Sequence, residues 1–236
     1  MNTNNTQILK DKYNKDFNTA LNIHENEYSH EDLISFLKNG SDAEKQAAVL
    51  KLDSVNTKEE AKILMSNLTG CDGKIREAVS FRLKEFIPEH PEFYVQFYDT
   101  ILDSVIDING NICRNILYAI KYLKNYPEFY INFCKKLIAE TQLIINKVKL
   151  FNIQDGKYTI NKEVFKLYWY LETISEFWRF IDKQDLKSII AETGKIYDYT
   201  IREKTAKILS QINDDKDLLR IKQELKNDEN YYVRRY

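Results

Sequence analysis

Three aspartates, Asp99, Asp103 and Asp107, are spaced four residues apart in a stretch that contains no lysine or arginine. On a helix this spacing places the carboxylates on one face, where like charges repel each other. A face that breaks this rule can mark a functional site. Three collinear carboxylates, however, offer too few oxygen ligands for a hard metal ion. The pattern favours a solvated acidic face, and we predict no metal and no cofactor.

The next stretch, residues 111–149, is basic, with seven lysine or arginine residues and two glutamates. Apolar residues at three- and four-residue spacing predict a helix over residues 111–125. Its expected core face is formed by Cys113, Ile116, Leu117, Ile120 and Leu123, and its other face by Arg114, Tyr118, Lys121 and Tyr122. Aromatic residues and arginine are frequent binding anchors, and a basic excess selects an acidic partner. An ordinary lysine-rich surface predicts the same composition, so both interpretations remain open.

The cysteines and histidines form no recognisable chemical motif. The three cysteines lie far apart without metal-ligand or redox spacing, which is typical of reduced core thiols in a cytosolic protein: Cys71, Cys113 and Cys134. No further ligand completes a metal set around the three histidines, His24, His30 and His90. Glycine-rich phosphate loops and nucleophile elbows are absent from the sequence. The sequence leaves open a catalytic site whose residues are far apart in the chain and come together only in the fold.

The composition is that of a globular helical protein. Of 236 residues, 43% are hydrophobic and 30% are charged, and only 6 are glycine and 3 are proline, which favours helices joined by short loops. A net charge of −1 makes a nucleic-acid partner unlikely without a local basic patch. No run of 18 apolar residues and no signal-peptide core are present, so we expect a cytoplasmic protein without a membrane span.

An internal repeat is visible in the sequence. Residues 91–98 read PEFYVQFY and residues 127–134 read PEFYINFC, a period of 36 residues that suits one helix–turn–helix unit. Pro91 and Pro127 suit the first turn of a helix, where the missing N–H costs nothing. The apolar residues that follow recur at helical spacing. We therefore predict that a helix begins at each proline.

A second pattern marks the other helix of each unit. Residues 72–86 read DGKIREAVSFRLKEF and residues 198–212 read DYTIREKTAKILSQI. Asp72 and Asp198 are natural N-caps, because their carboxylates can accept from free N–H groups of the first turn. Weaker copies occupy residues 42–52 and 109–123, and the closing DENYYVRRY begins another copy.

This pattern of Asp, then Ile-Arg, then apolar residues at helical spacing resembles the second helix of HEAT repeats. The resemblance implies an all-α fold, an α-solenoid of stacked antiparallel helical hairpins with the second helices on the concave side. It also implies that Asp72 with Arg76, and Asp198 with Arg202, are structural pairs that bridge turns within and between repeats.

We predict an N-terminal helix or cap over residues 1–28 and a repeat array over 29–236, interrupted at about 149–162. In the interruption, Asp155-Gly156 lies between short segments in which apolar and polar residues alternate. This is typical of a β-hairpin with a tight turn, and a plain surface loop is the alternative. The alternating apolar residues are Phe151, Ile153, Tyr158 and Ile160.

Two classes of function fit a stack of this kind. The first is a non-enzymatic interaction module or scaffold that holds a protein or peptide partner, acidic on the argument above, on its concave surface. The alternative is an enzyme, because DNA-alkylation-repair glycosylases are also HEAT-like. By that resemblance Trp169, Trp178, Arg179 and Asp182 would surround an extruded base. The near-neutral charge favours the interaction module, and we expect no base excision.

Overall fold

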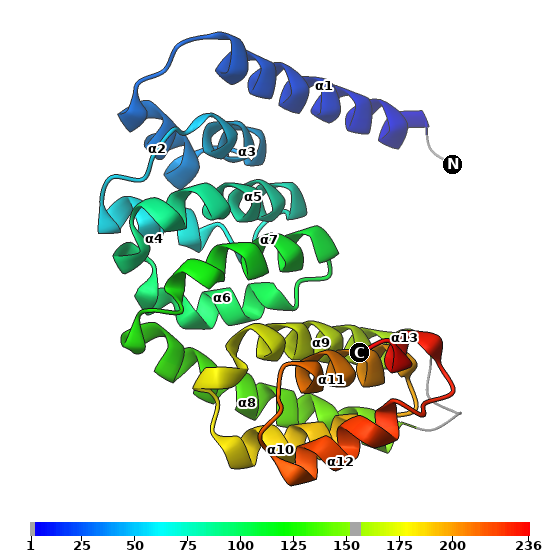
Figure 1. The fold of residues 1–236 in the computed structure, drawn as a ribbon. Coiled ribbons are helices and arrows are strands. Elements are labelled where there is room, and N and C mark those ends of the chain that lie inside the picture. The colour runs from blue at the N-terminus through cyan, green and yellow to red at the C-terminus, as the bar shows by residue number, and fades with distance from the viewer. Residues whose placement is uncertain (1–2, 152–156) are drawn as a thin grey trace. The chain divides into compact units, whose positions relative to one another are not determined.

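The structure, a computed structural model, describes residues 3–151 and 157–236, and every element in these two ranges is a helix (Figure 1). The predicted all-α class is confirmed. The chain divides into two compact units, an N-terminal unit that ends at Leu123 and a C-terminal unit that begins at Lys124. No helix of the described residues is long and apolar enough to cross a bilayer.

The N-terminal unit contains two rows of helices. In the odd row, α3 packs between α1 and α5, and α5 packs against α7; in the even row, α2 packs against α4 (Figure 1). The rows meet where α2 contacts α3 and α6 contacts α7. The helices are α1 (Thr3–Glu25), α2 (His30–Asn39), α3 (Asp42–Lys51), α4 (Lys58–Ser66), α5 (Gly73–Glu89), α6 (Tyr98–Val105) and α7 (Gly110–Ile120), with short 3-10 turns η1 (Pro91–Phe93), η2 (Val95–Phe97) and η3 (Lys121–Leu123).

The C-terminal unit repeats this arrangement. Its odd row places α11 between α9 and α13, and its even row places α10 between α8 and α12. Of the predicted hairpins, α2 packs against α3, α6 against α7, α8 against α9 and α10 against α11. The helices are α8 (Pro127–Leu150), α9 (Lys157–Phe177), α10 (Lys183–Thr193), α11 (Tyr199–Ser210), α12 (Lys216–Leu225) and α13 (Tyr231–Arg234), with the 3-10 turn η4 (Trp178–Phe180).

Side-chain caps fix where the odd-row helices begin. Asp72 Oδ1 accepts from the Lys74 N–H at 2.8 Å, and Asp198 Oδ1 accepts from the Thr200 N–H at 2.9 Å, so both predicted N-caps are confirmed. Ser41 caps α3 through a reciprocal capping box with Glu44. Because each cap satisfies N–H groups that the helix leaves free, helices of this row start at defined residues.

The predicted core face of residues 111–125 is also confirmed. The five apolar residues all lie in the interior of the N-terminal unit, each less than a tenth exposed: Cys113, Ile116, Leu117, Ile120 and Leu123. Burial raises the pKa of Cys113 to about 12, so its thiol stays protonated at neutral pH. Burial likewise raises the pKa of Cys134 to about 12. Cys71 departs from the prediction, because it is only partly buried.

The predicted β-hairpin near residues 149–162 is wrong in its second half. Residues 157–162 form the first turns of α9, while residues 149–150 end α8; residues 152–156 lie outside the described residues. The residues after 162 form an apolar helix. Extending that helix toward its N-terminus adds one backbone hydrogen bond for each residue fixed. An isolated two-stranded hairpin has no comparable support.

The two PEFY segments adopt different geometries. Pro127 begins α8 as predicted, whereas residues 91–97 form the 3-10 turns η1 and η2, and α6 begins only at Tyr98. Tyr94 is fully buried at this point. The same PEFY sequence therefore begins an α-helix at Pro127 but forms 3-10 turns after Pro91, and the buried Tyr94 lies between the two 3-10 turns.

Candidate functional site

The arginines of the repeat pattern pair with aspartates other than the predicted ones. Arg76 Nε donates to Asp107 Oδ2 at 2.7 Å, and Arg202 Nε donates to Asp228 Oδ2 at 2.6 Å. Each guanidinium also donates to a backbone carbonyl of the loop before its own helix, that of Cys71 and that of Tyr197. The predicted pairs with Asp72 and Asp198 are corrected, because those carboxylates cap helices instead.

Both arginine partners occupy equivalent loop positions. Asp107 Oδ1 accepts from the Asn109 N–H at 2.9 Å, and Asp228 Oδ1 accepts from the Asn230 N–H at 2.8 Å. Each aspartate therefore connects the arginine of one odd-row helix to the N-cap residue of the next odd-row helix. The hydrogen bond from Arg202 lowers the pKa of Asp228, which keeps this carboxylate charged at neutral pH.

The acidic face proposed from Asp99, Asp103 and Asp107 does not form as one set. The helix α6 ends at Val105, so Asp107 lies in the following loop, where it pairs with Arg76. Asp103 and Asp99 remain exposed on α6. Within the described residues, no group of three His, Cys, Asp or Glu side chains is placed to hold a metal ion.

An exposed apolar ladder crosses the odd row of the N-terminal unit. Leu50, Phe81 and Tyr118 each follow the N-cap of their helix by nine residues, on α3, α5 and α7 respectively. They are 47%, 43% and 55% exposed. These helices are neighbours in one row, so the three residues occupy equivalent positions on adjacent helices, and Leu50 and Phe81 line one hollow. We call these three residues the exposed ladder.

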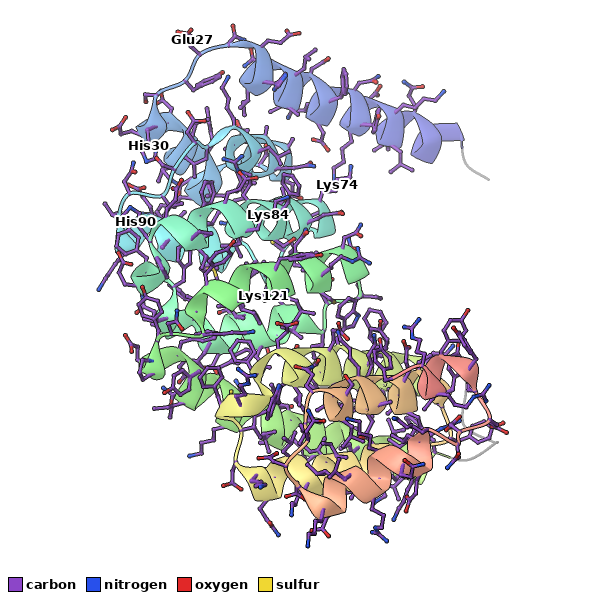
Figure 2. The ribbon with its side chains drawn as sticks, viewed as in Figure 1. Glu27, His30, Lys74, Lys84, His90 and Lys121 are labelled. Atoms are coloured by element: carbon purple, nitrogen blue, oxygen red, sulfur yellow. The ribbon has the colours of Figure 1, made fainter. Side chains whose placement is uncertain are left out.

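Two lysines cover the aromatic members of the exposed ladder. Lys84 Nζ lies 3.7 Å from the ring centre of Phe81, and Lys121 Nζ lies 5.0 Å from that of Tyr118. Each lysine follows its ring by three residues, and Figure 2 shows Lys84 on α5 and Lys121 at the end of α7. A cation over an aromatic face is attracted by the ring quadrupole. The repeated pair therefore presents positive charge beside apolar surface.

All four predicted partner-binding residues lie on this row. Arg114, Tyr118, Lys121 and Tyr122 are exposed, and Arg114 Nη1 donates to Asn111 Oδ1 at 3.0 Å. The structure thus places them together on the face of α7 and η3 that is opposite the core.

Two hollows border the exposed ladder. The first, about 380 Å³, lies over α3, α5 and α7. The second, about 580 Å³, lies between α1 and α3. Gln46 and Leu50 line both, so the two hollows adjoin at α3. The first is also lined by Lys74, Glu77, Ala78, Phe81, Asn111 and Asn115, and the second by Phe17, Ala20, Leu21, His24, Ala47 and Lys51.

The corresponding row of the C-terminal unit is charged and internally paired. Lys207 follows the N-cap of α11 by nine residues, the position of Phe81 in α5, and its ammonium donates to Glu172 Oε1 on α9. Lys204 Nζ lies 3.1 Å from Glu172 Oε2, and Arg235 donates to Glu203 at 2.6 Å. The apolar ladder is therefore a feature of the N-terminal unit.

The residues considered for a base-excision site each make a local contact. Trp169 is buried in α9, and Trp178 Nε1 donates to Gln211 Oε1 at 3.0 Å. Arg179 lies over the Trp178 ring at 5.2 Å, and Asp182 caps α10 through the Gln184 N–H at 2.8 Å. Trp169 packs edge-on against Tyr168, with ring centres 5.3 Å apart.

Comparisons with known proteins identify no relative by sequence. No family model matches the chain, and no curated protein matches it significantly. A similar solved structure is the crystal structure of an engineered protein, with 13% identity over 89% of this chain and 93% of the other, and a TM-score of 0.44. A likeness at this level carries no argument about function.

Sequence reasoning missed Leu50, Phe81 and Lys84. A sign of them in the sequence is that α3, α5 and α7 each have an apolar or aromatic residue nine positions after the N-cap, and α5 and α7 have a lysine three positions later. The sequence of one helix does not identify these residues, because a single apolar residue on a helix is usually assigned to the core.

Proposed function

We propose that the chain is a non-enzymatic interaction module, a HEAT-like stack whose second helices bind an acidic segment of a partner protein. The observation that carries the proposal is the exposed ladder, with a lysine over each of its two rings. Aromatic side chains are frequent binding anchors, and flanking cations select acidic partners. Repeat proteins commonly use such extended surfaces for recognition.

The charges around the ladder favour an acidic partner. Glu77, an acid on this face, already accepts from the side-chain amides of Asn109 and Asn111, each at 3.1 Å. Lys74, Lys84 and Arg114 contribute positive charge to the same face. A partner that brought basic groups would meet like charges here. An acidic partner would meet cations already positioned beside apolar surface.

The test is a Tyr118→Ala, Lys121→Glu double variant. We expect it to weaken binding of a partner isolated by affinity capture from native extract by about 10- to 100-fold, as expected for losing one aromatic anchor and reversing one charge. Binding of the unaltered protein should weaken with added salt, because exposed charges are screened. Isothermal titration measures both effects.

The matched control is a Lys195→Glu, Tyr197→Ala double variant in the C-terminal unit, where both side chains are exposed. It makes the same two changes away from the ladder and should bind normally. Unchanged affinity in a Tyr118→Ala, Lys121→Glu variant whose circular dichroism spectrum is native would remove this surface as the binding site.

A further inference from the structure

We propose that the segment bound at the exposed ladder is an extended peptide with an apolar side chain at every third residue and acidic side chains between them. This inference rests on the proposed function and adds the conformation and the pattern of the partner. It follows from the spacing of the ladder, the polar lining of its hollow and the position of its lysines.

The spacing between ladder positions suits an extended chain. Leu50, Phe81 and Tyr118 lie at equal distance from the starts of three helices that pack side by side. Packed helices are about 8–10 Å apart. A peptide in the extended polyproline II conformation advances about 3.1 Å per residue with three residues per turn, so every third side chain points the same way and three residues span one step of the ladder. A helix advances about 1.5 Å per residue and would need about five to seven residues for the same step.

The polar lining of the hollow points the same way. Gln46, Asn111 and Asn115 line it beside Leu50 and Phe81. Asn111 Nδ2 already donates to Glu77 and Asn115 Nδ2 to Ser80, which leaves each amide a second N–H and an oxygen lone pair for the backbone of an extended peptide. A helical partner satisfies its own backbone groups and has no need of such a lining.

The lysines define where the acidic residues of the peptide belong. Lys84 and Lys121 each lie one helical turn beyond a ladder ring, at the same register of neighbouring helices. A peptide whose apolar residue contacts the ring therefore passes each lysine with an adjacent residue. An acidic residue at that place makes a charge-assisted contact with the ammonium group. The expected pattern is apolar residues at i, i+3 and i+6 with Asp or Glu between them.

Selection from a displayed library of random peptides tests the pattern without knowledge of the natural partner. Peptides of about 12 residues are long enough to span three ladder positions in extended form. The library is selected on the full chain and counter-selected on a Phe81→Ala, Tyr118→Ala variant. We expect enriched peptides with three-residue apolar spacing and acidic residues between. Synthetic copies should bind a Lys84→Glu, Lys121→Glu variant at least about 10-fold more weakly, as expected for two reversed charges.

The outcomes separate this inference from the proposed function. Enriched peptides with apolar residues at i, i+4 and i+7 that become helical on binding would overturn the extended conformation and leave the interaction surface in place. A selection without enrichment would also overturn it, since a folded partner domain could still use the face. Enriched peptides that bind the full chain and the Phe81→Ala, Tyr118→Ala variant equally would overturn both proposals.

Discussion

Replacing Arg202 with alanine should lower the free energy of unfolding by about 1–3 kcal/mol, because the change leaves a nearly buried carboxylate without its donor. The Arg202 and Asp228 side chains are only 12% and 9% exposed, and the guanidinium also serves the carbonyls of Ile196 and Tyr197. Arg76→Ala should have a similar effect through Asp107. Chemical denaturation followed by circular dichroism measures both losses.

The loss of stability in Arg202→Ala should depend on pH in a defined direction. Because the hydrogen bond from Arg202 lowers the pKa of Asp228 in the folded state, the pair stabilises fully above the unfolded-state pKa of about 3.9. The difference between the unaltered protein and Arg202→Ala should therefore shrink as the pH falls below about 4. The control is Arg220→Ala, an exposed arginine of α12. Equal stability of Arg202→Ala and the unaltered protein at pH 7 would contradict a structural role for the pair.

Glu172→Gln should destabilise the C-terminal unit by about 2–4 kcal/mol, since breaking a buried ion pair leaves an uncompensated charge. Lys204 and Glu172 are 10% and 19% exposed in their side chains. Burial raises the pKa of Glu172, but the hydrogen bond from Lys207 and the charge of Lys204 outweigh it, so the net pKa is lowered. The glutamine would leave Lys204 and Lys207 as neighbouring cations without an anion.

A second substitution distinguishes the lost pair from general damage to α9. Lys204→Met in the Glu172→Gln background should recover most of the stability, because an apolar side chain of similar length removes the buried charge. Glu224→Gln, at an exposed site on α12, is the matched control and should stay within about 0.5 kcal/mol of the unaltered protein. A Glu172→Gln variant as stable as this control would show that the cluster contributes nothing.

The helix starts were predictable from sequence because their causes are local. Asp72 and Asp198 cap the first turn of their own helices, and the apolar spacing of residues 111–125 needs no distant partner to identify its core face. The partners of Arg76 and Arg202 were not predictable in this way, since Asp107 and Asp228 lie 31 and 26 residues away. The sequence sign of these partners is the Asp-x-Asn pattern that precedes both α7 and α13.

The candidate site, too, was predictable from sequence only where its causes are local. Tyr118 and Lys121 were found because a strongly periodic helix has an unambiguous opposite face. Phe81 and Leu50 were not found, because the exposed ladder exists only when three helices are aligned by their N-caps, and that alignment depends on how the hairpins pack. The hairpin expected at Asp155-Gly156 failed in its second half for a related reason, since residues 157–162 join the helix that follows them.

Site-specific photo-crosslinking tests the interaction surface most directly. A photoreactive phenylalanine analogue is placed at Phe81, at Tyr118 or, as the control, at Tyr197, which is 97% exposed in the C-terminal unit. After irradiation in native extract, mass spectrometry identifies the attached segment. We expect positions 81 and 118 to capture one acidic segment of a single protein, less efficiently at high salt, and position 197 not to capture it. Equal capture of that segment at position 197, or no specific capture at positions 81 and 118, would contradict a partner-binding role for the exposed ladder.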